Sequence, residues 1–187
     1  MRTFFCIPLA PGTREAIGSV AEQIRTATKM RASWVRPENY HVTVRFLGDI
    51  DPTLTVDLDE VARRVVSDRP PFEVRLDCLD AFPSIDRARV LWCGGVTPEA
   101  YVKLVCEVNR ELCGIGFDPE RKRPASHVTV ARIKGTPDPA LGGIVDRLNP
   151  LQAQTVRVDR IVLMESRLTP DGAVYAPLFE APFGGEA

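Results

Sequence analysis

The sequence contains two histidines, and both begin the same tetrapeptide. His41 opens H-V-T-V at residues 41–44, and His127 opens it again at residues 127–130. With 21 valines and 12 threonines among 187 residues, chance places V-T-V after a histidine only about once in 1,200 cases. Composition therefore does not explain the repeat.

The repeated residue types suit acid–base chemistry at phosphorus. In a β-strand alternate side chains share a face, so each histidine projects beside the threonine two residues later while the valines anchor the strand to the core. Histidine has a pKa of about 6.5, so two facing imidazoles supply a base and an acid near neutral pH. The hydroxyls of Thr43 and Thr129 can donate to phosphate oxygens. A duplicated strand with only a structural role is the alternative.

Each motif ends a similar succession of elements. In both halves we expect a strand, an amphipathic helix and then the histidine-bearing strand. The expected segments are strand Phe4–Leu9, a helix capped by Thr13 and ending near Met30, strand Tyr40–Leu47, strand Arg89–Val96, a helix capped by Thr97 and closed at Gly114, and strand His127–Ile133. A pseudo-twofold axis between the halves would bring the two polar pairs face to face.

The remaining segments complete a mixed fold. They are a helix with an apolar stripe over residues 54–65, strand Phe72–Cys78, a short helix around residues 141–148, and strands Thr155–Met164 and Ala173–Phe179 on either side of a turn at Pro170-Asp171-Gly172. The predicted fold class is α+β, a bilobal pseudo-twofold arrangement of two antiparallel-type β-sheets with flanking helices and a central cleft. Residues 1–187 are expected to form a single compact domain of two similar lobes that share this cleft.

Composition limits the partners of the protein. Lysine and arginine number 24 against 25 acidic residues, so the net charge is −1 and any contact with nucleic acid must be local. The longest uncharged run, Thr3–Thr13, is too short for a membrane span, and we expect a strand there rather than a signal peptide. The five cysteines form no C-x-x-C pair, so we expect buried free thiols in a reducing cytoplasm and no metal site. We also expect a monomer that needs no cofactor.

The motifs resemble those of the two-histidine (2H) phosphoesterases, which carry paired H-x-[ST]-x motifs, and most of all the RNA 2',3'-cyclic 3'-phosphodiesterase (2'-5' RNA ligase) type. The matching segments are Phe4–Ile7, Asn39–Gly48, Arg89–Trp92, His127–Arg132 and Tyr175–Leu178. The resemblance implies the bilobal fold and a substrate that is an RNA or nucleotide with a 2',3'-cyclic phosphate. It also implies metal-independent opening of that ring to a 2'-phosphate.

Residue by residue, the resemblance makes His41 the general acid for the departing 3' oxygen and His127 the base that activates water. Thr43 and Thr129 correspond to phosphate-binding hydroxyls, and Arg132 to a family arginine near the phosphate. Strict alternation puts Arg132 on the face opposite His127, so this role requires a β-bulge or the end of the strand near that point. A solvent-facing arginine is the alternative. Arg45 has the parity of His41 and is an alternative phosphate contact. Ser126 stands where family members often have proline.

Several alternatives remain open at this point. The substrate can instead be a cyclic phosphate of a small nucleotide or of ADP-ribose, ligation can be the reverse reaction, and the protein can be a noncatalytic RNA-end binder. A metal hydrolase using Asp49 ranks last. The basic run Arg121-Lys122-Arg123 is expected to be solvated, with a contact to the RNA backbone as the alternative. Tyr40 and Phe46 are expected to pack in the core rather than stack on a base, and for Tyr175 both roles stay open.

Overall fold

The computed structural model describes residues 1–170 and 172–185. Its helices and strands, in chain order, are β1 (Arg2–Pro8), α1 (Pro11–Ala27), β2 (Ala32–Trp34), β3 (His41–Asp49), α2 (Thr55–Val66), β4 (Phe72–Leu76), β5 (Cys78–Phe82), β6 (Val90–Gly94), α3 (Glu99–Gly114), β7 (His127–Ile133), α4 (Leu141–Leu148), β8 (Gln154–Val158), β9 (Arg160–Thr169) and β10 (Gly172–Pro182). Short 3-10 turns lie at Pro37–Asn39, Pro52–Leu54 and Ile85–Arg87.

The main sheet consists of two antiparallel halves. Its strand order is β10-β9-β1-β3-β7-β6-β5, with β2 beside β7, and the strands β4 and β8 form a separate antiparallel pair. The two histidine-bearing strands, β3 and β7, join the halves through the pair Val42–Val128. The predicted α+β class with antiparallel pairing is confirmed, but the two separate sheets that the sequence predicted are the halves of one continuous eight-stranded sheet, which meet at the motifs themselves.

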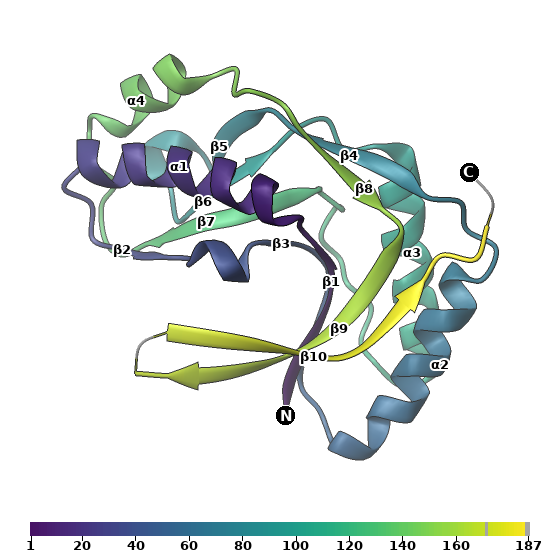
Figure 1. Cartoon of the computed structure of the whole chain (residues 1–187). Coiled ribbons are helices and arrows are strands. Elements are labelled where there is room, and N and C mark those ends of the chain that lie inside the picture. The colour runs from purple at the N-terminus through teal and green to yellow at the C-terminus, as the bar shows by residue number, and fades with distance from the viewer. Residues whose placement is uncertain (171, 186–187) are drawn as a thin grey trace.

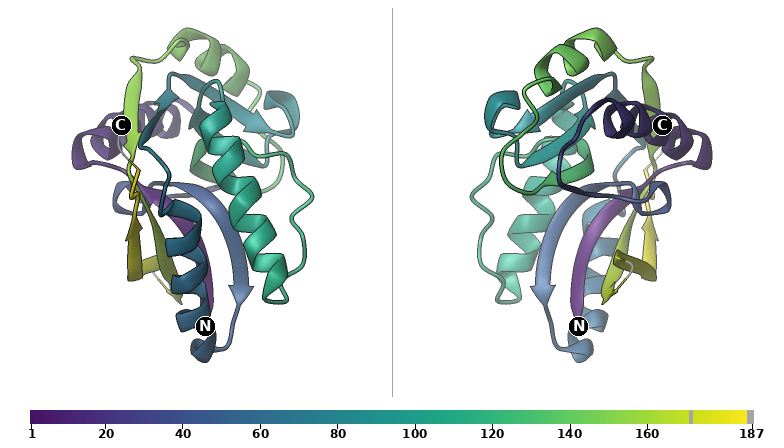
Figure 2. Two further views of the ribbon diagram at one scale, coloured as in Figure 1. Left: turned by 90° about the vertical axis from the view of Figure 1, so that its right-hand side faces the viewer. Right: turned by 90° about the vertical axis from the view of Figure 1, so that its left-hand side faces the viewer.

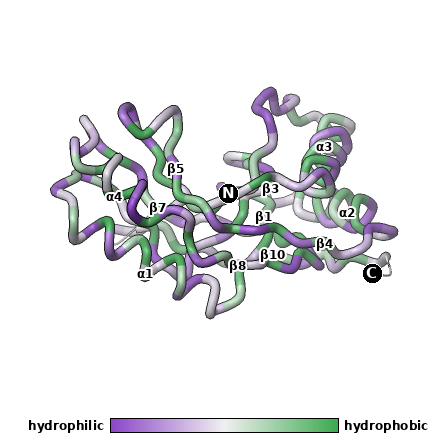
Figure 3. Tube along the Cα trace, turned by 90° about the horizontal axis from the view of Figure 1, so that it is seen from above, coloured by the Kyte–Doolittle hydropathy of each residue, from purple (hydrophilic) through white to green (hydrophobic). Residues whose placement is uncertain are grey.

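The helices cross over between the halves. Helix α1 follows β1 and precedes β3 in the chain, yet it packs against β7 and α4. Helix α3 leads from β6 to β7, yet it packs against β3 and α2. The pairs α1/α4 and α2/α3 therefore lie at opposite ends of the molecule (Figures 1 and 3). Figure 2 shows α2 and α3 side by side over the strands.

Each of these two helices buries its apolar face against the half of the sheet that it crosses to. The buried residues of both helices recur every three or four positions, and they include Ile17 and Ile24 in α1 and Leu104 and Val108 in α3. The chain thereby encloses one apolar core that draws on strands of both halves. A second, small cluster of Phe4, Cys6 and Val162 lies apart from it.

Four element predictions are wrong in detail. The expected strand Phe72–Cys78 ends at Leu76, and Cys78 begins β5, a strand that was not expected. The expected strand Thr155–Met164 is two strands interrupted at Asp159, because β8 pairs with β4 whereas β9 pairs with β1 and β10. Helix α1 begins at Pro11, so Thr13 lies within its first turn rather than capping it, and the helix ends at Ala27. Thr97 does not cap α3 either, because the helix begins at Glu99 and its N-cap residue is Pro98. The Oγ1 of Thr97 instead accepts a hydrogen bond from the amide of Ser126 at 3.1 Å.

The cysteine prediction is also only partly correct. Cys6 and Cys93 are buried and Cys78 is half-buried, but Cys106 and Cys113 are exposed. The last two share a face of α3, as their spacing predicts, but it is the face away from its buried stripe. All five thiols are free.

Two further expectations concern the membrane and the last turn. Within residues 1–170 and 172–185, no helix is long and apolar enough to cross a membrane. The central residue of the turn expected at Pro170-Asp171-Gly172 lies outside the described residues.

Candidate active site

The two H-V-T-V segments meet in antiparallel register at the middle of the sheet. Because Val42 lies opposite Val128, His41 comes beside Thr129 and His127 comes beside Thr43. The valines of both motifs are buried and the histidines and threonines are half-buried. The alternation predicted from the sequence therefore holds over both tetrapeptides.

Two adjoining cavities flank this row of polar side chains. The first, of about 490 Å³, is lined by His41 and by the β9–β10 hairpin. The second, of about 710 Å³, is lined by His127 and by the loop that leads into β7. The residues common to both linings are Thr43, Phe46, Thr129 and Arg132. The structure thus brings all five predicted site residues to one continuous cleft, with one histidine on each side.

Both imidazoles are fixed in the same tautomer. Nδ1 of His41 lies 2.7 Å from the carbonyl oxygen of Asn39, and Nδ1 of His127 lies 2.9 Å from that of Ala125. A carbonyl oxygen can only accept, so each Nδ1 carries the proton and donates it. Nε2 is left on each neutral ring as the atom that can take or, once protonated, give a proton.

Burial makes both rings reluctant to become charged. It lowers the pKa of His41 to about 4, and the positive charges of His127 and Arg132 act in the same direction. Burial, followed by the charge of Arg132, also lowers the pKa of His127. The hydrogen bond to the preceding carbonyl opposes the shift in both cases. Both rings are therefore neutral at pH 7 in the free protein.

A β-bulge brings Arg132 to the cleft. Strand β7 pairs Thr129 with Trp92 but Ala131 with Leu91, so Val130 is an extra residue. Val130 and Ala131 are both buried, and Arg132 emerges on the face of Thr129, where it lines both cavities. Of the two irregularities that could bring Arg132 to the cleft, the structure has the bulge.

A matching bulge in β3 overturns two predictions. Cys6 lies opposite Thr43 but Phe5 lies opposite Arg45, so the extra residue reverses the alternation beyond Thr43. Phe46 consequently stands on the cleft face, 54% exposed, with its ring 5.7 Å from that of Phe4, and not in the core. The prediction that Tyr40 is a core residue is confirmed.

Arg45 correspondingly leaves the face of His41. Its Nη2 donates to the carbonyl of Asp118 at 2.6 Å, and its Nη1 lies 3.1 Å from the Glu120 carboxylate. The guanidinium still lines the larger cavity, but these two partners engage it. The expectation that Arg45 shares the face of His41 is wrong, because strand alternation does not survive the bulge.

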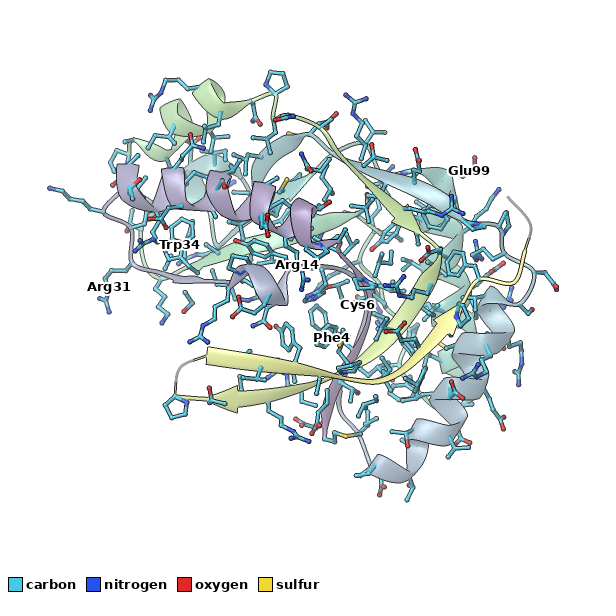
Figure 4. The ribbon with its side chains drawn as sticks, viewed as in Figure 1. Phe4, Cys6, Arg14, Arg31, Trp34 and Glu99 are labelled. Carbon is cyan, nitrogen blue, oxygen red and sulfur yellow. The ribbon has the colours of Figure 1, made fainter. Side chains whose placement is uncertain are left out.

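Aromatic side chains surround each histidine, and of these the sequence had left only Tyr175 open for a role at the site. The ring of His41 lies 4.7 Å from that of Phe4 and 5.4 Å from that of Tyr175. Phe4 projects from β1 toward the β9–β10 hairpin (Figure 4). The ring of His127 lies 5.2 Å from Phe82 and 5.9 Å from Trp92. These neighbours come from strands whose register only the tertiary structure supplies.

Asp49, the carboxylate proposed for a metal site, does not lie beside the two histidines. Asp49 lies opposite Arg2 at the far end of β3, eight residues from His41, or about 26 Å along the strand. Among the residues that the structure describes, no group of three or more histidine, cysteine or carboxylate side chains is placed to hold a metal ion.

The fold and the paired motifs define a class of phosphoesterase. The family model described as "LigT like Phosphoesterase" matches residues 7–92 and 96–175, and the chain belongs to this family. A Thermotoga maritima protein named "RNA 2',3'-cyclic phosphodiesterase" is 32% identical over 186 residues, covering 99% of this chain and 97% of that one. A relative of the same name from Aeropyrum pernix is 36% identical over 148 residues, covering 78% and 83%.

Solved structures share the fold. A Thermus thermophilus protein superposes with a TM-score of 0.83 at 23% identity and covers both chains completely. Escherichia coli LigT, crystallised with 3'-AMP, gives a TM-score of 0.77 at 22% identity and covers 97% of each chain. The family resemblance drawn from the motifs is confirmed.

Proposed function

We propose that this protein is an RNA 2',3'-cyclic phosphodiesterase that opens the cyclic phosphate at an RNA end to a 2'-phosphomonoester. The observation that carries the proposal is the meeting of the two H-V-T-V strands at Val42–Val128, which leaves one imidazole Nε2 on each side of a shared cleft. The names of the relatives support the same substrate.

In the proposed reaction the phosphate lies against Thr43 and Thr129, whose hydroxyls donate to its non-bridging oxygens, while Arg132 offsets the charge that develops there. Nε2 of His127 removes a proton from water, and the water oxygen attacks phosphorus opposite O3'. The P–O3' bond breaks and Nε2 of protonated His41 gives O3' its proton. The phosphate stays on O2'.

The electrostatics of the site support these roles. A pKa of about 4 makes protonated His41 a strong acid for the departing oxygen. The negative charge of a bound phosphodiester favours the protonated ring and so raises this pKa in the complex. Binding of the substrate thereby favours protonation of His41, and this proton is the one transferred to O3'.

The test is turnover of 2',3'-cyclic AMP by purified protein, with the product compared with authentic 2'-AMP and 3'-AMP. We expect 2'-AMP, formed at the same rate with and without EDTA. The matched control is the His41→Ala/His127→Ala double variant from the same purification. Formation of 3'-AMP would reverse the assignment of the histidines. Tight binding of a cyclic-ended RNA without any turnover would favour the noncatalytic RNA-end binder.

Ligation is the second candidate, favoured by the size of the cavity beside His127. Its volume of about 710 Å³ far exceeds the roughly 30 Å³ of one water. A 5'-hydroxyl in place of water would lose its proton to His127, form a bond to phosphorus and displace O3', which gives a 2'-5' linkage without ATP. Joining of a cyclic-ended oligonucleotide to a 5'-hydroxyl oligonucleotide tests this; absence of a joined product at high enzyme concentration removes it.

We further infer that residues 1–187 work as one domain, as a monomer, in the cytoplasm. Both cavities draw their linings from both halves of the sheet, so neither half holds a complete site. The five unpaired thiols suit a reducing compartment. Light scattering at a mass near 20.7 kDa is the expected result for the monomer, and a doubled mass contradicts it.

Small nucleotides and ADP-ribose derivatives remain alternative substrates. They are separated from RNA by the ratio of kcat/KM for a cyclic-ended oligonucleotide to that for 2',3'-cyclic AMP. A ratio well above one supports RNA, and a ratio below one supports the small nucleotide.

A further inference from the structure

We propose that the cavity beside His127 is a nucleotide subsite in which Lys122 and Arg123 bind the backbone phosphate of a 5'-hydroxyl oligonucleotide. The inference rests on the proposed function, because it assigns an occupant to the side from which the oxygen attacks phosphorus. It goes beyond that function by naming the residues that would recognise a second RNA strand, the one that carries the 5'-hydroxyl.

The cavity has the lining that a nucleoside requires. One wall is aromatic and apolar, formed by side chains such as Phe46, Phe82 and Val90. Phe82 is 39% exposed although its ring stacks on Trp92 at 5.1 Å, so an open aromatic edge faces the space beside His127. Aromatic surfaces of this kind bind bases by stacking.

The lining of the same cavity also includes two basic residues, here called its basic rim. They are Lys122 and Arg123, whereas the adjacent Arg121 is not part of the lining. Among residues 1–170 and 172–185, neither Lys122 nor Arg123 has a carboxylate within the 4.0 Å of an ion pair. The charge of Lys122 acts on the Glu120 carboxylate from a longer distance, and that carboxylate pairs with Arg45. In a protein of net charge −1, two such cations beside the reacting centre form a local site for a phosphate.

A shielded ion pair holds this rim in place. Arg45, whose side chain is only 10% exposed, binds the carbonyl of Asp118 and the carboxylate of Glu120. The Glu120 carboxylate in turn accepts a hydrogen bond from the amide of Lys122 at 3.1 Å. The Asn109 side chain of α3 donates to the carbonyl of Glu120 and accepts from its amide. The loop is thereby fastened to β3 two residues beyond Thr43.

The cavity and its basic rim lie where the 5'-hydroxyl RNA strand must bind. The attacking oxygen comes from the side of His127, so a nucleoside that carries it as a 5'-hydroxyl occupies this cavity. The 3'-phosphate of that nucleoside lies one sugar away from the reacting phosphorus, toward the rim. Arg45 acts as a positioning residue, because its two partners set where the rim stands relative to Thr43.

The test measures the dissociation constant of 5'-hydroxyl triadenylate by calorimetry, which does not depend on turnover. We expect Lys122→Ala/Arg123→Ala to weaken binding about tenfold or more, and Arg121→Ala, the matched control, to change it less than about twofold. The KM for 2',3'-cyclic AMP is measured with the same proteins. Its change is expected to be smaller than the change in the dissociation constant.

Three results would overturn the subsite: no binding of the trinucleotide to the unmodified protein, equal weakening by Arg121→Ala, or equal changes in the dissociation constant and in KM. Absence of 2',3'-cyclic AMP turnover with normal trinucleotide binding would instead contradict the proposed function alone. The two failures are therefore distinguishable.

The positioning role is tested with Arg45→Met and Arg45→Lys. We expect Arg45→Met to weaken trinucleotide binding about fivefold at an unchanged far-ultraviolet circular dichroism spectrum, because the rim loses its anchor. Arg45→Lys keeps one charged contact and is expected to recover part of the affinity. Equal affinity in all three proteins removes the role from Arg45.

Discussion

Strands β3 and β7 carry the same tetrapeptide and fold it in the same way. In both, the histidine donates Nδ1–H to the carbonyl two residues earlier, and in both a bulge follows the threonine. The difference comes five residues after the histidine, where β3 presents Phe46 to the cleft and β7 presents Arg132. The shared scaffold supplies two equivalent imidazoles, and what stands beside them makes the site asymmetric.

The strands opposite the histidines differ as well. His41 lies opposite Pro8 and beneath the ring of Tyr175, whereas His127 lies opposite Gly94 and beside Trp92. The half around His41 is closed by the β9–β10 hairpin, which Asn39 ties down through a 2.7 Å bond to the carbonyl of Ala173. The comparison teaches that the repeated tetrapeptide places equivalent side chains on both strands, whereas the residues around each histidine make the two sides different.

The largest expected effect breaks the symmetric part of the comparison. Replacing either His41 or His127 with alanine removes one of two proton transfers and is expected to lower kcat for 2',3'-cyclic AMP at least about 100-fold. Because both act in one displacement, the double variant is expected to fall only slightly below the single ones. Steady-state kinetics checks this, with melting temperatures as the control for folding. Full activity in either single variant contradicts the paired mechanism.

The second largest expected effect concerns the position at which the two strands differ, Arg132 in β7 and Phe46 in β3. Arg132→Met removes a charge beside the phosphate and is expected to lower kcat about 10- to 100-fold with a smaller change in KM. Phe46→Ala, at the equivalent position of the other strand, removes an exposed ring and is expected to act mainly on KM, by about tenfold. If the two variants give the same ratio of kcat to KM effects, the positions are not functionally different.

A smaller effect concerns the packing behind His127. A Cβ on Gly94 would lie 2.8 Å from the ring of Trp92 and 2.9 Å from the carbonyl oxygen of Ser126. Gly94→Ala is therefore expected to destabilise the protein by about 1–3 kcal/mol, measured by urea unfolding. In Gly143→Ala, the control in helix α4, the nearest atom is 3.9 Å away and a gain of up to about 1 kcal/mol is expected. Equal stabilities would show that the region relaxes freely.

The smallest effect is a displacement of the pH profile. With both pKa values lowered by burial, the free protein holds two neutral rings at pH 7, whereas the reaction requires one of them protonated. The value of kcat/KM is expected to rise as the pH falls below 7, and kcat to peak about one pH unit higher, because bound phosphate raises both pKa values. Arg132→Met removes a charge that lowers both pKa values and is expected to move the kcat/KM optimum upward. A kcat/KM optimum above pH 7.5 would contradict this order.

Local patterns predicted much of the molecule. The two tetrapeptides identified the family, the α+β class and the strands at His41 and His127, since period-two alternation and β-branched residues are properties of short stretches of chain. Local patterns failed where pairing with other strands decides the structure. The division of residues 155–164 between two strands follows from pairing with β4 on one side and β1 on the other, which no local pattern contains.

The side from which a residue faces the cleft was decided in the same way. Alternation read along the chain put Phe46 in the core and Arg132 on the far face, and each was reversed by a single extra residue at a bulge. A bulge arises from the register of two strands together, so it leaves little trace in either strand alone.

The sequence by itself determined which groups are available for the proposed chemistry, because the identity and spacing of His41, Thr43, His127 and Thr129 are covalent facts. Only the tertiary structure decided that the two motifs touch at Val42–Val128, that α1 and α3 each cover the opposite half, and that Arg132 enters the cleft. Those outcomes depend on contacts between segments far apart in the chain, whose energies exist only once the whole core has assembled.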